Sequence, residues 1–133
     1  MRSLLNLGGH MAARNFVESQ TLTRGVITLH GKATGTGTDA AQTLTHGAGI
    51  TSVVQSATSV LTITLADKYA AFLGMDVSFV DAGTVDDWNF TVTAETVSST
   101  KTIVGTVFKG GSAAALPATA KICFAIKLLN TSR

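Results

Sequence analysis

The fold of this chain is decided by the stretch Ile122-Cys123-Phe124-Ala125-Ile126-Lys127-Leu128, in which large apolar residues alternate with small or polar ones. The same period of two recurs in Leu61-Thr62-Ile63-Thr64-Leu65 and in Phe90-Thr91-Val92-Thr93-Ala94. Successive side chains of a β-strand point to opposite faces of its sheet, so each stretch predicts a strand with one apolar face. The alternation therefore predicts an all-β protein.

Outward from these stretches, the pattern predicts about seven or eight short strands separated by segments rich in Gly, Ser, Thr and Asp. The expected strands cover residues 25–30, 49–56, 59–65, 75–80, 88–97, 102–108 and 120–129. A hairpin turn is expected at 98–100 and a long loop at 31–45, where Gly, Thr and Ala dominate. This spacing is typical of a β-sandwich or a jelly-roll-like barrel, so residues 24–133 are expected to form one such domain.

The segment 67–73 interrupts the alternation and predicts a short helical turn. Asp67 suits the N-cap position, because its carboxylate can accept hydrogen bonds from the first N–H groups of a helix. Gly74 suits the left-handed position that follows a helix. Tyr69, Phe72 and Leu73 would then share one face and close one end of the core.

Residues 1–23 show no clear period and are expected to form an extended N-terminal arm. Terminal segments of this kind are often frayed. This one carries the apolar residues Phe16, Val17 and Leu22, which gain by packing on something. The arm is therefore expected to be ordered against a partner.

The composition predicts a surface that is covered by other subunits. Charged residues make up 14% of the 133 residues, compared with about 25% in typical soluble domains. A net charge of +2 without clustered Lys and Arg disfavours nucleic acid as a partner. The longest apolar runs are shorter than the roughly 20 residues of a membrane-spanning helix, so no membrane contact is expected.

The residue types that carry chemistry are present but scattered. His10, His30 and His46 have no metal-ligand spacing, and Cys123 has no second cysteine to pair with. No Gly-x-Ser-x-Gly motif is present to activate a serine. The sequence therefore predicts no catalytic residue, no metal, no cofactor and no enzymatic activity.

The turn at 81–87 leaves two alternatives open. Asp81, Asp86 and Asp87 could supply oxygen ligands to calcium, but solvated aspartates that cap their own backbone are favoured. Trp88, which follows, could offer a platform for a sugar ring, although a tryptophan in a strand more often fills a core or an interface.

Four segments, in their order along the chain, resemble small virion structural proteins of tailed phages. They are Ala13-Arg14-Asn15-Phe16, Thr23-Arg24-Gly25-Val26, Thr62-Ile63-Thr64-Leu65-Ala66-Asp67-Lys68-Tyr69 and Leu128-Leu129-Asn130-Thr131-Ser132. The resemblance spans Met11 to the C-terminus and is strongest to head decoration (cement) proteins, which are commonly β-rich and oligomeric. It implies a location on the capsid exterior of the virion, after assembly in the host cytoplasm.

The resemblance also implies two partners, the major capsid protein and a second or third copy of the chain itself. The residues expected to contact the capsid are Arg14, Asn15, Phe16, Leu22 and Arg24. The residues expected to contact the capsid or another copy are Trp88, Leu128, Asn130 and Arg133. The alternative function is a receptor- or glycan-binding module of a phage tail or fibre.

Overall fold

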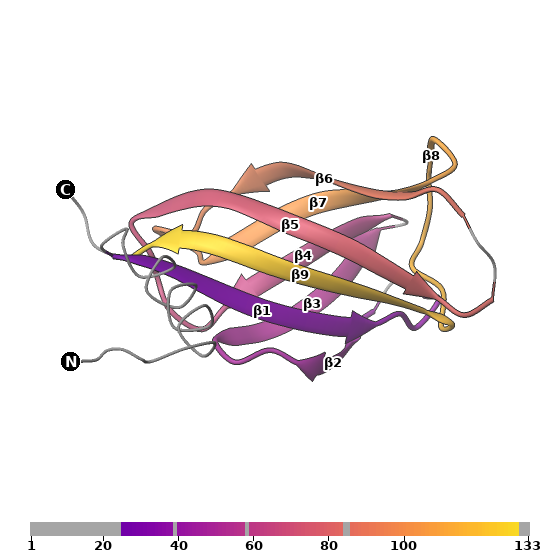
Figure 1. The fold of residues 1–133 in the computed structure, drawn as a ribbon, viewed down its shortest axis with the longest axis horizontal. Coiled ribbons are helices and arrows are strands. Elements are labelled where there is room, and N and C mark those ends of the chain that lie inside the picture. The colour runs from indigo at the N-terminus through magenta and orange to yellow at the C-terminus, as the bar shows by residue number, and fades with distance from the viewer. Residues whose placement is uncertain (1–24, 39, 58, 84–85, 131–133) are drawn as a thin grey trace, which may run out of the picture.

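Two antiparallel sheets make up the protein in the computed structural model, which describes residues 25–38, 40–57, 59–83 and 86–130 (Figure 1). The described strands are β1 (Val26–Thr34), β2 (Thr43–His46), β3 (Ile50–Ala57), β4 (Val60–Leu65), β5 (Ala71–Asp81), β6 (Trp88–Glu95), β7 (Thr102–Lys109), β8 (Ser112–Ala113) and β9 (Ala120–Leu129). The first sheet has the order β2-β1-β9-β5, and the second has the order β3-β4-β7-β6, with β8 paired to β7. The prediction of an all-β, sandwich-like fold is confirmed, whereas the jelly-roll-like alternative is not confirmed by this strand order.

The core lies between the sheets and is built by the alternating stretches. Leu61, Ile63 and Leu65 of β4 and Ile122 of β9 are all fully buried there. The other fully buried large side chains are Val53, Gln55, Val97, Ile103, Val107, Leu116, Ile126 and Leu128. The hairpin expected at 98–100 is also confirmed, because β6 pairs with β7 across that turn.

The helical turn predicted at 67–73 is wrong. The backbone N–H of Tyr69 donates to the carbonyl of Val97 (3.0 Å), and β5 begins two residues later. A one-turn helix gains few hydrogen bonds, whereas β5 pairs with β9 along its whole length. Gly74 has a positive φ of 146° because it lies at a β-bulge that begins at Phe72, not because it ends a helix.

The loop predicted at 31–45 is also partly wrong, because β1 continues through Gly31 to Thr34 and β2 follows it. Gly31 faces the core, where a β-carbon would overlap the ring of Phe124. The glycine thus permits close packing and is not a sign of a flexible loop.

The two long sides of the sandwich differ. On the side of β2 and β3, the chain crosses between the sheets: Gln42 N–H donates to Val53 O (2.8 Å), and Gln55 N–H donates to Ala40 O (2.9 Å). The other side, at the top of the view in Figure 1, is formed by the edge strands β5 and β6. β5 pairs with β9 and β6 pairs with β7, and neither β5 nor β6 has a second partner among the described strands. We call this β5/β6 side the open side.

The two ends of the described chain lie together at one end of the sandwich. The N–H of Asn130 donates to the carbonyl of Gly25 (2.7 Å). The turn between β5 and β6 lies at the opposite end (Figure 1). None of the described residues forms a helix with the length and hydropathy required to cross a membrane.

Candidate interaction surface

Apolar side chains follow the open side from end to end. They point inward and pack against the core, but each keeps part of its surface exposed. On β5 they are Phe72, Met75, Val77 and Phe79, and on β6 they are Trp88, Phe90 and Val92. Because no crossing segment covers this side within the described residues, the edge of the core reaches the surface here.

The outer face of β5 adds two exposed apolar residues. Leu73 is 50% exposed and Val80 is 51% exposed, and these are the large apolar side chains recorded as exposed among the described residues. These two residues lie near the two ends of β5, roughly 20 Å apart along the strand, and on the opposite face from the half-buried row, so they are separate exposed side chains. An edge strand that carries exposed apolar side chains is a candidate for contact with another chain.

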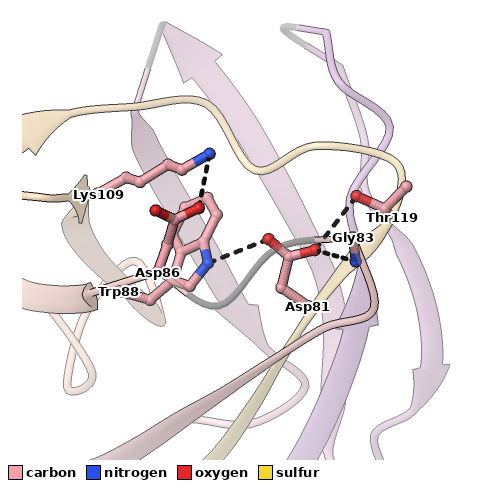
Figure 2. A network of polar contacts seen from close by, with 6 residues as sticks. All are labelled: Asp81, Gly83, Asp86, Trp88, Lys109 and Thr119. Atoms are coloured by element: carbon pink, nitrogen blue, oxygen red, sulfur yellow. Dashed lines mark hydrogen bonds and ion pairs between the residues drawn. The ribbon is translucent and has the colours of Figure 1, made fainter.

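A network of hydrogen bonds and an ion pair links β5 to β6 at one end of the open side (Figure 2). The Asp81 carboxylate accepts hydrogen bonds from Gly83 N–H (2.9 Å), Thr119 Oγ1 (3.4 Å) and Trp88 Nε1–H (3.3 Å). Asp81 ends β5 and Trp88 begins β6, so one carboxylate ties the two edge strands together. Asp81 thus caps the backbone of its own turn, as predicted, whereas Asp86 pairs with the Lys109 ammonium.

The ring of Trp88 is occupied by contacts within the chain. Phe79 stacks on it, with ring centroids 5.5 Å apart and an angle of 21° between the planes. The Lys109 ammonium lies 5.4 Å from the ring centroid and 3.1 Å from Asp86 Oδ2. Trp88 thus fills the gap between the sheets, as expected of a core or interface tryptophan, and its ring offers little free surface to a sugar.

A shallow groove of about 370 Å³ lies on the outer face of the first sheet. Ala125 lies in it, with His30 and Asp76 level with it on the neighbouring strands, one on each side. Two strand spacings, roughly 9–10 Å, separate the backbones of His30 and Asp76, and the structure shows no hydrogen bond or ion pair between these two side chains. Among the residues that the structure describes, no group of three His, Cys, Asp or Glu side chains could hold a metal ion.

Most of the residues predicted to make contacts lie outside the described part of the chain. These residues are Arg14, Asn15, Phe16, Leu22, Arg24 and Arg133. Leu128 is fully buried in the core, so its side chain is not available to a partner in the folded domain. Asn130 is exposed, but it lies at the opposite end of the sandwich from Trp88, so these two residues do not form one site.

The exposure of Leu73 and Val80 on β5 was missed by the sequence analysis. Its signal was present, because Leu73 and Val80 occupy positions where an outward-facing strand residue is usually polar. The helical interpretation of 67–73 removed Leu73 from the strand and concealed that signal.

No protein-family model, no curated protein and no solved structure matches the chain.

Proposed function

We propose that this chain is a non-enzymatic structural subunit that decorates the outer surface of a phage head, where it binds the major capsid protein and further copies of itself. The observation that carries the proposal is the open side of a sandwich with few charges. Half-buried apolar residues line that side, and Leu73 and Val80 are exposed on the outer face of its edge strand β5. Apolar area of this kind is stabilised when a neighbouring subunit covers it.

The mechanism of such a subunit is mechanical. A protein that bridges joints between capsid subunits opposes their separation under the outward pressure of packaged DNA. Many identical contacts, each weak, hold the shell strongly because they act together. The low charge of the chain, 14% of its residues, suits faces that are buried in an assembly.

The arm provides the contact with the shell in this proposal. Arg14, Phe16, Leu22 and Arg24 combine positive charge with apolar anchors. The arm joins the domain at Gly25, next to Asn130, so that end of the sandwich would face the capsid. The open side then runs away from the shell contact and remains available to neighbouring copies.

The experiment is deletion of residues 1–22, followed by co-sedimentation with heads that lack the protein. Binding to heads is expected to be lost, while the fluorescence of the chain's single tryptophan and its cooperative thermal unfolding are retained. A second variant removes residues 131–133 and keeps the arm, which separates the contribution of Arg133 from that of the arm. Full occupancy of heads by the variant that lacks residues 1–22 would contradict the proposed role of the arm, and absence of binding by the full chain would contradict the function.

The tail or fibre alternative requires an exposed aromatic platform for a receptor or glycan. The stacking of Trp88 on Phe79 disfavours that alternative. We expect a glycan array probed with the full chain to give no specific signal.

A further inference from the structure

We propose that β5 is the site of self-association: its open edge pairs antiparallel with β5 of a second copy, with Val77 on the two-fold axis. The two first sheets then join into one continuous sheet across the dimer. This inference deepens the proposed function, since it names the surface through which copies associate. It does not depend on the shell, because the pairing is expected in solution.

The first argument is the character of the β5 edge. β5 spans Ala71–Asp81, 11 residues, and contains no Lys, Arg or Pro. Exposed edge strands are normally short, or carry Lys, Pro or bulges that prevent pairing with other chains. The bulge of β5 lies near its start, between Phe72 and Gly74, and leaves the rest of the strand regular. A long edge of this kind is a template for another strand.

The other edges are protected. β2 has 4 residues, and β3 is covered by the crossing segment that contains Gln42. On β6, the Asn89 side chain accepts the N–H of Phe90 (2.8 Å), and a bulge interrupts the strand between Val92 and Ala94. β5 is therefore the edge among the described strands that is best suited to accept a partner.

The second argument is that β5 complements itself. Residues directly opposite in an antiparallel pair lie on the same face, so a two-fold axis at Val77 places each residue opposite a defined partner. On the inner face, Met75 meets Phe79 of the second copy, which extends the apolar row of one open side into the next. On the outer face, Val80 meets Gly74 of the second copy, where the direction of a β-carbon points to empty space.

The exposed residues are covered by the same arrangement. Val80 lies over the second copy's backbone at Gly74, next to Leu73 of that copy, and the symmetry repeats this contact. The two side chains that are half exposed in one chain, at 50% and 51%, are thereby buried together. A second copy is thus an occupant that accounts for both exposed residues on the strand at once.

Charge and the bulge disfavour two neighbouring registers. An axis at Asp76 would place two carboxylates directly opposite each other, which is destabilising. An axis at Met75 would bring the bulge at 72–74 to the centre of the ladder. With the axis at Val77, Asp76 faces Ser78 of the second copy, and each Asp76 keeps its ion pair with Lys127 of its own chain (3.8 Å).

The test uses Ser78, which is exposed on the outer face of β5, away from the core. Ser78→Asp would place a carboxylate opposite Asp76 twice in the dimer, and Ser78→Lys would place an ammonium there. The dimer dissociation constant of the full chain is measured by sedimentation velocity over a concentration series. We expect Ser78→Asp to raise it about two- to thirtyfold and Ser78→Lys to lower it, the latter effect weakening as salt is added.

The matched control is Thr91→Asp, which adds the same charge to the outer face of β6, and it is expected to leave the dimer unchanged. Thermal unfolding of each variant shows that the domain remains folded. Equal effects of Ser78→Asp and Thr91→Asp, or effects of the same sign from Ser78→Asp and Ser78→Lys, would overturn the proposed register and surface. A wild-type chain that stays monomeric would overturn self-association. If the full chain is monomeric but the variant without residues 1–22 forms a dimer, the arm of the same chain occupies the β5 edge, and self-association of the full chain through β5 is overturned.

The two proposals fail separately. A monomer that still binds heads would overturn the pairing of β5 and leave the decoration function standing. A dimer that follows the predicted charge effects but binds no heads would support the pairing of β5 and overturn the decoration function.

Discussion

Tyr69 closes the core at the end where the described chain begins and ends. It is 8% exposed, and its N–H is held by the carbonyl of Val97. Burial raises the pKa of the Tyr69 phenol above its ordinary value of 10.0, and the Asp67 carboxylate adds to the rise. The phenol therefore keeps its proton in the folded chain at a pH where the unfolded chain begins to lose it.

This difference predicts how the stability depends on pH. The contribution of the protonated phenol is fully present below about pH 10 and is lost as the pH rises through the higher pKa of the folded state. The melting temperature of the wild type is expected to fall more steeply between about pH 9 and about pH 11 than that of Tyr69→Phe. Because the chain has one tyrosine, the tyrosinate absorbance also gives the pKa directly. Titration of the folded protein at or below the ordinary value would contradict the prediction.

Glycine at position 105 shows how one residue can shape the open side. The ring of Phe90 occupies the space that a β-carbon at Gly105 would need. Phe90 on β6 can therefore lie flat over β7 and cover the backbone where no side chain is present. The half-buried position of Phe90 at the surface is thus set by a residue on the neighbouring strand.

The elements differ in how far the sequence predicts them. β4, β7 and β9 were predicted closely, because both of their faces are specified by alternation, as in Leu61, Ile63 and Leu65. β5 was not, because Asp67 and Gly74 carry local signals of a helix that pairing with β9 overrides. β2 was hidden in a run of Gly, Thr and Ala, since it packs few large side chains.

The interaction surface was the harder part to predict. Whether Leu73 and Val80 are exposed depends on which strands lie at the edges of the sheets, and strand order is set by pairing between distant segments. Trp88 was correctly singled out as a packing residue. Its partners Phe79 and Lys109 come from other strands, so the sequence alone could not identify them.

The polar network that joins β5 and β6 predicts that two aspartates contribute very differently to the free energy of unfolding. Asp81→Ala removes the acceptor of three hydrogen bonds and is expected to lower the free energy of unfolding by about 1–3 kcal/mol. Asp86→Ala, the matched control, breaks an ion pair that is partly exposed to solvent and should cost no more than about 1 kcal/mol. Chemical denaturation followed by Trp88 fluorescence measures both. Equal losses from the two variants would show that Asp81 does not hold β5 and β6 together.

For the whole molecule, pairing through β5 makes thermal stability depend on protein concentration. Association stabilises the folded chain by mass action. A tenfold increase in concentration, in the range where the dimer dominates, is expected to raise the melting temperature by about 2–4 °C. Differential scanning fluorimetry over a dilution series measures this, and Ser78→Asp should show a smaller dependence. A melting temperature that is constant over the series would speak against a dimer that forms only from folded chains.

The position of β9 in the first sheet has a consequence for biosynthesis. β9 lies between β1 and β5 and follows both of them in the chain, so it leaves the ribosome after them. Until it emerges, β1 and β5 each lack the neighbour against which they form most of their ladder. The sheet is therefore completed only after β9 has been synthesised, by contacts between residues far apart in the chain, which is a slow route to a native state.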